Sequence, residues 1–107
     1  ALWSWGDGAV GRLGHGDTQR QLLPKKVEAL AGQRVLAVSA GNDHSLALTA
    51  DGALWSWGDG AVGRLGHGDT QRQLLPKKVE ALAGQRVLAV SAGNDHSLAL
   101  TADGALW

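Results

Sequence analysis

The sequence is a single repeat written twice. Residues 1–52 recur without one change as residues 53–104, and residues 105–107 begin a third copy. A repeat of this length is typical of solenoids and propellers, in which each unit buries its apolar faces against its neighbours. We therefore expect residues 1–107 to be part of a single domain. Because the third copy stops inside an expected strand, we also expect a longer polypeptide that holds a whole number of repeats.

Three segments of the repeat have the composition of β-strands. Segment 33–41 is apolar and rich in small and β-branched residues, which predicts an inner strand buried on both faces. Segment 44–49 alternates large with small side chains, so the two sets face opposite sides of a second strand. The Asp51-Gly52 turn signal then predicts a hairpin into a third strand, 53–57, whose two tryptophans share one side.

A fourth segment, 74–80, carries the markers of an edge strand. Pro76 lacks a donor for a strand ladder, and Lys77 and Lys78 discourage a further strand from pairing. The repeat is thus apolar at one end and charged at the other, as expected of a four-stranded antiparallel propeller blade that runs from axis to rim. Helix is nearly absent, since only 79–83 has helical composition and a glycine ends it.

A glycine-rich connection, 58–70, joins the third and fourth strands. Its Gly-Arg-Leu-Gly-His-Gly, together with Ser-Trp-Gly before it and Ala-Gly-Asn-Asp-His-Ser-Leu-Ala-Leu-Thr-Ala-Asp-Gly, resembles the repeat of the regulator of chromosome condensation family over the whole chain. That family forms β-propellers, commonly with seven blades of four antiparallel strands. The resemblance implies an all-β propeller with two identical 52-residue repeats in this chain. The paired glycines of kelch repeats and the Trp-Asp dipeptide of another propeller repeat are missing.

The resemblance does not select one activity. Members of the family exchange nucleotides on a small GTPase, inhibit β-lactamases or perceive ultraviolet light, so the fold alone cannot choose. In light-sensing members, a tryptophan and an arginine lie in a Gly-Trp-Arg-His-Thr motif, where this chain has Gly-Asn-Asp-His-Ser at 41–45. Large apolar anchors between sheets are therefore the better interpretation of the tryptophans Trp3, Trp5, Trp55 and Trp57.

Composition excludes several classes of partner and site. Ten Lys and Arg balance ten Asp and Glu, so the chain has no basic patch of the kind that nucleic-acid binding needs. No apolar run is long enough to cross a membrane, and no charged and apolar leader is present. Without cysteine, disulfides and thiolate chemistry are absent. We expect a soluble chain without a targeting signal that binds neither nucleic acid nor membrane.

The Gly-x-Gly-x-x-Gly pattern at 6–11 superficially matches a dinucleotide-binding loop. Such a loop must open a helix whose N-terminus receives the pyrophosphate, but Gly14 and Gly16 follow almost at once. No helix is therefore expected here. We interpret the segment and its copy as a turn-rich loop anchored by Val10 and Leu13.

Histidines and lysines are the other candidates for chemistry. His44 and Ser45 are adjacent in a strand and point to opposite faces, so a nucleophile and base pair within one blade is not expected. His15 with Asp17 supplies two ligands, fewer than a closed metal site needs. The same applies to His67 with Asp69, and the paired lysines are solvated edge protection. We expect no catalytic, cofactor-binding or metal-binding residues.

Identical repeats restrict function further, because any site must occur in every blade or lie on the axis. We expect a structural scaffold, a symmetric and self-assembling designed propeller without catalytic activity. The alternative is a natural protein-interaction propeller, exchange-factor-like or inhibitor-like, in which a ring of Asn42 and Asp43 copies meets its partner. Other copies of the same repeat, in a longer chain or a homo-oligomer, are expected to complete a ring, with eight blades favoured over six or seven.

Overall fold

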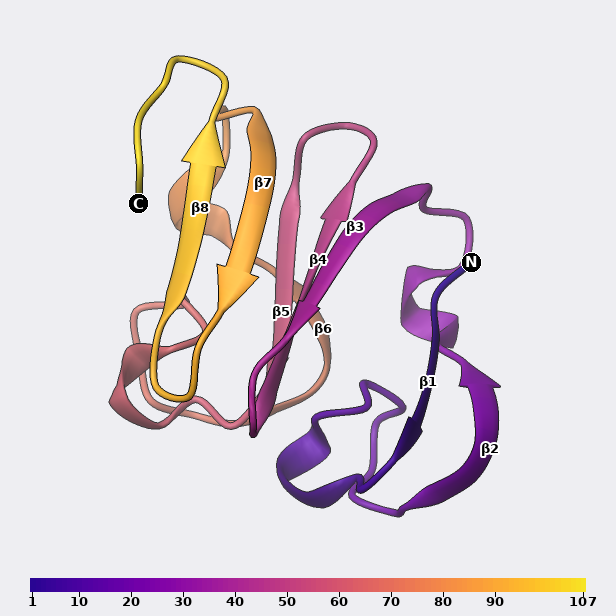
Figure 1. Cartoon of the computed structure of the whole chain (residues 1–107). Coiled ribbons are helices and arrows are strands. Elements are labelled where there is room, and N and C mark those ends of the chain that lie inside the picture. The colour runs from indigo at the N-terminus through magenta and orange to yellow at the C-terminus, as the bar shows by residue number, and fades with distance from the viewer.

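The computed structural model describes residues 1–107 and shows three antiparallel sheets standing side by side (Figure 1). The central sheet has four strands in the order β3-β4-β5-β6, and two-stranded sheets flank it. The central strands are β3 (Val35–Ala40), β4 (His44–Thr49), β5 (Leu54–Gly58) and β6 (Gln73–Lys78). The flanking pairs are β1 (Trp3–Gly6) with β2 (Gln21–Lys26), and β7 (Val87–Ala92) with β8 (Ser97–Thr101).

Each blade combines halves of two sequence repeats. The central blade takes β3 and β4 from residues 1–52 and β5 and β6 from residues 53–104. By the same repeat, β1 and β2 are the outer strands of the preceding blade, and β7 and β8 are the inner strands of the following one. The chain therefore contains one whole blade between two half blades, and these do not close into a ring.

The predicted strand order is confirmed, with the Pro76-containing strand β6 at the outer edge of the sheet. The expected lack of helix is also confirmed, because the helical elements are four single 3-10 turns. No helix of the chain is long and apolar enough to cross a membrane. The turns are η1 (Ala9–Gly11), η2 (Glu28–Leu30), η3 (Ala61–Gly63) and η4 (Glu80–Leu82).

The prediction that the inner strands are buried on both faces is wrong for this chain. In β3, burial alternates along the strand, and Leu36 and Val38 are more than half exposed. Between them, Ala37 packs against the apolar cluster that β3 and β4 share with β7 and β8. The reason is that the preceding half blade contributes only the outer strands β1 and β2, so no inner strand covers the other face of β3.

Two apolar clusters lie on opposite sides of β4, as the alternation of its side chains predicts. One joins the central blade to β7 and β8, and the other joins it to the β1–β2 half blade. The blade thus has no core of its own, because its apolar surface is buried between blades. The first cluster comprises Leu46, Leu48, Leu54, Val79, Leu82, Val87 and Ala99. The second comprises Val27, Leu30, Ala47 and Trp57.

The two tryptophans of β5 lie on one side of the strand and have different surroundings. Trp57 is only 2% exposed and lies in the second cluster. Trp55 is half-buried at its margin, where its Nε1 donates to Thr49 Oγ1 at 3.2 Å and Lys78 Nζ lies 5.5 Å from the ring centroid. The interpretation of the tryptophans as anchors between sheets is confirmed for Trp57, whereas Trp3 and Trp5 are 52% and 59% exposed.

The substitution Trp57→Ala tests this anchor, and Trp5→Ala is its matched control at the equivalent position of the first repeat. Loss of the buried Trp57 indole leaves a cavity, which should reduce the free energy of unfolding by about 3 to 5 kcal/mol. Trp5 is 59% exposed, so its loss should change stability far less. Chemical denaturation of the two variants beside the parent measures both effects, and equal losses would contradict the role assigned to Trp57.

Candidate functional site

Ion pairs between blades gather on the loops at one end of the sheets, the lower end in Figure 1. Here Arg12, just after η1, reaches the turn between β3 and β4 of the next blade. Its Nη1 donates to Asn42 O at 2.9 Å, and its Nη2 lies 3.0 Å from Asp43 Oδ1. Arg64 repeats the arrangement, donating to the Asn94 carbonyl at 2.9 Å and to Asp95 Oδ1 at 3.2 Å.

Asp43 connects these two clamps, since its Oδ2 lies 3.8 Å from Arg64 Nη1. Arg12, Asp43, Arg64 and Asp95 therefore form a chain of alternating charge across the loop face. The two signs are not equally accessible, because the Arg64 side chain is 7% exposed and the Asp95 side chain 76% exposed. In this pair the Asp95 carboxylate is therefore more accessible to solvent than the Arg64 guanidinium, and both arginines contact the turn of the following blade.

Serine and histidine side chains meet at three places, although sequence reasoning considered only neighbours within one strand. His44 Nε2 lies 3.0 Å from Ser97 Oγ, which belongs to the next blade. The other two pairs join each third strand to its glycine-rich loop. They are Ser4 Oγ with His15 Nε2 at 2.9 Å and Ser56 Oγ with His67 Nε2 at 2.8 Å. Because Ser97 is the copy of Ser45, pairing residues across repeats could have found its contact with His44.

The hydrogen bonds of these pairs run in the wrong direction for nucleophilic catalysis. Ser97 Oγ donates its proton to the Arg64 carbonyl at 2.7 Å, so His44 Nε2 must carry a proton and donate to the serine. A general base would have to accept that proton instead. In addition, His44 Nδ1 has no hydrogen-bond partner, so no carboxylate orients the ring as in a triad. Ser56 is bound in the same way by the carbonyl of Leu65.

The other sequence candidates take structural roles. Segment 6–11 contains one 3-10 turn rather than a helix, as predicted. His15 contacts Ser4, while Asp17 Oδ1 accepts a hydrogen bond from the backbone of Gln19 at 3.2 Å. The structure contains no group of three or more His, Asp or Glu side chains suited to a metal ion.

The two expected anchors of the glycine-rich loop behave differently. Leu13 is buried, as is its copy Leu65. Val62, the copy of Val10, is 70% exposed, so it is not an anchor. Both valines have a positive φ of 55°, which is unusual for a β-branched residue. Val10 is half-buried because its turn packs against β6 of the central blade, whereas the turn that contains Val62 has no such strand against it.

The buried indole of Trp57 is held both through its N–H and by close packing against its ring. Its Nε1 donates to the Arg12 carbonyl at 2.9 Å, and that carbonyl also accepts from Ser45 Oγ at 2.9 Å. Gly14 lies so close to the ring that a Cβ built there would be 2.8 Å from Nε1. These contacts form a socket between the half blade and the central blade.

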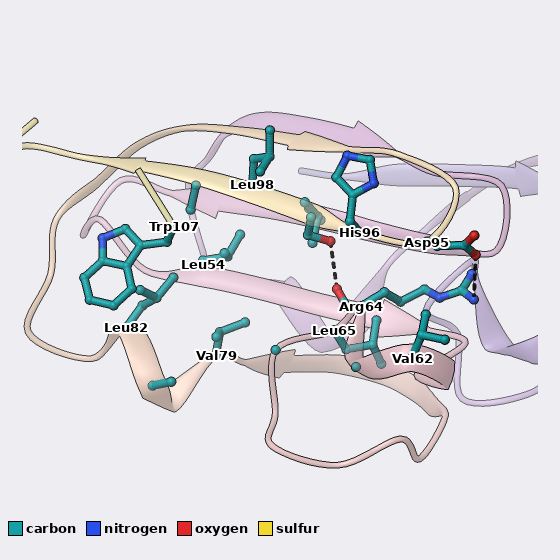
Figure 2. Close-up of a pocket in the computed structure, with 16 residues that line it drawn as sticks. Leu54, Val62, Arg64, Leu65, Val79, Leu82, Asp95, His96, Leu98 and Trp107 are labelled. Carbon is teal, nitrogen blue, oxygen red and sulfur yellow. Dashed lines mark hydrogen bonds and ion pairs between the residues drawn. The ribbon is translucent and has the colours of Figure 1, made fainter. Parts of the chain in front are cut away.

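A pocket of about 330 Å³ lies at the equivalent place on the other side of the central blade. Figure 2 shows it between the η3 loop, η4 and β8, with the Trp107 ring beside Leu82 at one end. Most of its lining is apolar. The loop carbonyl of Arg64, which accepts from Ser97 Oγ, lies at its polar side.

Acidification should destabilise the chain through His44. Burial, followed by the nearby Arg64 charge, lowers the pKa of His44 from its ordinary value of 6.5. The unfolded chain therefore binds more protons below pH 6.5, and folding stability should fall as pH decreases through that range. His44→Gln, which keeps an N–H donor for Ser97, should flatten the pH dependence of the unfolding free energy between about pH 7.5 and about pH 5.5. A variant with the parent's slope would contradict this assignment. Part of the pH dependence should remain in this variant, because burial also lowers the pKa of His67.

The socket also predicts different costs for one substitution in the two repeats. Gly14 and Gly66 both have positive φ, 81° and 77°, so alanine strains the backbone equally. A Cβ at Gly14 would collide with the Trp57 indole, whereas at Gly66 its nearest contact would be Val79 Cγ1 at 3.4 Å. Gly14→Ala should therefore lower the thermal midpoint more than Gly66→Ala. Indistinguishable midpoints in a thermal melt would show that the indole can move aside.

Similarity to known proteins agrees with this geometry. The chain matches the family described as "Regulator of chromosome condensation (RCC1) repeat" over residues 1–48 and 51–100. It is 46% identical over 108 residues to "E3 ubiquitin-protein ligase HERC2" of Homo sapiens, covering 99% of this chain and 2% of that protein. It is 42% identical over 106 residues to "Ultraviolet-B receptor UVR8" of Arabidopsis thaliana, covering 99% of this chain and 24% of the receptor.

Solved structures show the same arrangement of blades. Human WBSCR16 matches with a TM-score of 0.79 and 31% identity, and Prp20p of Saccharomyces cerevisiae with 0.83 and 28%. Each match covers 97% of this chain and 27% of the other, so the chain spans about a quarter of those structures. The relatives are natural proteins, and they give no support to the prediction of a designed chain. With two matched repeats that cover nearly all its residues, the chain belongs to the regulator of chromosome condensation (RCC1) repeat family.

Proposed function

We propose that the chain is a two-repeat segment of a protein-binding propeller whose loop face docks a basic surface of another protein. The observation that carries the proposal is the division of charge on that face. Arg12 and Arg64 are engaged in clamps between blades, whereas the Asp95 and Asp7 side chains are 76% and 69% exposed. A partner approaching the loops therefore meets carboxylates, and complementary charge steers such encounters.

The relatives favour this role over that of an inert scaffold. Prp20p, which has the same arrangement of blades, has binding properties to Gsp1p and histones. In HERC2 the matched region covers 2% of the whole protein, consistent with a module added to other functions. The proposal includes no catalytic step, because the serine hydroxyls donate to backbone carbonyls. The eight-blade ring stays a prediction, which the mass of the closed assembly would test.

Binding of a labelled peptide rich in lysine and arginine tests the loop face. Asp95→Asn removes an exposed negative charge there and keeps the Oδ1 acceptor for Arg64. It should weaken binding by about two- to fivefold, the range of one exposed charge pair, and added salt should reduce the difference. Fluorescence anisotropy measures the dissociation constants.

Glu80→Gln is the matched control, since it makes the same change in net charge at an exposed side chain, the first residue of η4. It should leave the affinity for the peptide unchanged. Equal weakening by both substitutions would indicate nonspecific attraction to net charge, and no weakening by Asp95→Asn would refute docking at the loop face.

A further inference from the structure

His44 is a buried titratable side chain that the proposed docking of a partner does not use. Its exposed fraction is 0%, and it lies at the start of β4, where its ring meets Ser97 at the start of β8. The turn between β3 and β4 and the turn between β7 and β8 therefore contact each other here. This contact already encloses the ring without any further strand.

The two nitrogens of the His44 ring have different surroundings. Nε2 donates to Ser97 Oγ at 3.0 Å, because that hydroxyl already donates to the Arg64 carbonyl at 2.7 Å. Nδ1 is buried and has no hydrogen-bond partner. The backbone is close on this side, since a Cβ built at Gly41 would lie 2.7 Å from Nδ1 and 2.5 Å from the carbonyl oxygen of Gly93. A proton added to Nδ1 would thus become a buried donor without an acceptor, which costs free energy.

Charged groups reach this ring only from the loops, because β3, β5, β7 and β8 carry no titratable side chain. Asp43 before β4, Asp59 after β5 and a backbone group of His96 favour the charged ring. Burial, and then the charge of Arg64, disfavour it more strongly, so the pKa of His44 lies below its ordinary value of 6.5. In the closed contact the ring is therefore neutral at neutral pH.

The contact around His44 is polar at the loop end and apolar along the rest of the strands. At the loop end, Ser39 Oγ accepts from the Ala92 N–H at 3.0 Å. Farther along, the first apolar cluster joins β4 to β7 and β8. At the opposite end of β7, the Val87 N–H donates to the Gly52 carbonyl at 3.0 Å. The polar end can separate while the apolar cluster keeps the blades joined.

We propose that protonation of His44 at mildly acidic pH releases the β3–β4 turn from the β7–β8 turn, and that the blades stay joined through the first apolar cluster. In the released turn, water solvates both ring nitrogens. Arg64 keeps its ion pair with Asp95, so the β7–β8 turn stays in place. Asp43, which Arg12 binds, lies on the released turn, so the arrangement of charge on the loop face changes with pH. The release depends on this contact alone and not on the docking of a partner.

Amide hydrogen exchange at the two ends of β7 tests the proposal, because both N–H groups donate to the central blade. The protection factor of Ala92 should fall by about tenfold for each pH unit below 6.5, down to the pH at which the closed contact also binds the proton. Ala92 should be less protected than Val87 throughout, since its release leaves the apolar cluster intact. Equal protection factors at the two amides would show that the contact opens only as a whole, and would overturn the proposal.

Two matched variants separate His44 from the other histidines. His44→Gln keeps an N–H donor for Ser97 but takes up no proton, so the protection of Ala92 should lose its pH dependence. His67→Gln is the control, since burial also lowers the pKa of His67 but its Nε2 contacts Ser56 within the blade. It should leave the response of Ala92 as in the parent. A response that persists in His44→Gln, or that disappears in His67→Gln, would overturn the proposal.

Nitrogen NMR of the parent ring provides a measurement that needs no variant. At neutral pH the His44 proton should reside on Nε2, with Nδ1 unprotonated, because Ser97 Oγ accepts from Nε2. A proton on Nδ1 at neutral pH would overturn the proposal, because Nδ1 would then have no capacity to bind the added proton.

Discussion

The burial of one indole between neighbouring blades is the interaction on which the rest of the structure depends. Trp57 reaches from β5 into the preceding half blade, where its ring joins Val27 and Leu30 and its N–H reaches the Arg12 carbonyl. A four-stranded sheet with apolar side chains on both faces cannot bury them alone, so each blade is stable only beside another. Gly14 belongs to this contact, since only a residue without Cβ permits the ring to approach so closely.

The polar side chains between blades also hold neighbouring blades together. Arg12 and Arg64 clamp the turns of the following blades, while Ser45 and Ser97 bind the carbonyls of these same arginines. His44 of the central blade completes the arrangement by donating to Ser97 of the following blade. Groups whose residue types suggest catalytic machinery are consequently committed to holding blades in register. The Asp7 and Asp95 carboxylates stay exposed on the loop face, where we propose that a partner docks.

Because the repeat is exact, each residue of one copy can be compared with the same residue of the other copy. The same residue is seen once inside a completed interface and once at an open one, so a difference in burial reports the neighbour rather than the residue. Gly14 and Gly66 have the same backbone conformation, but only Gly14 meets an indole. Trp57 and Trp5 likewise share one sequence environment and differ in exposure. Both contrasts follow from which strands lie beside each residue.

Much of the fold was predictable from the sequence, because strand alternation, the Asp51-Gly52 turn and Pro76 act within a few residues of the chain. These local signals determined four antiparallel strands per blade, their order, and the shared side of Trp55 and Trp57. Contacts between blades needed the tertiary structure, since the hydrogen bonds among them join residues 30 to 53 positions apart. Only it showed that Arg64 is buried while Asp95 is exposed, and that the face of Leu36 and Val38 is open. The physical reason is that side-chain periodicity specifies which face a residue occupies, whereas the neighbouring blade determines what covers that face.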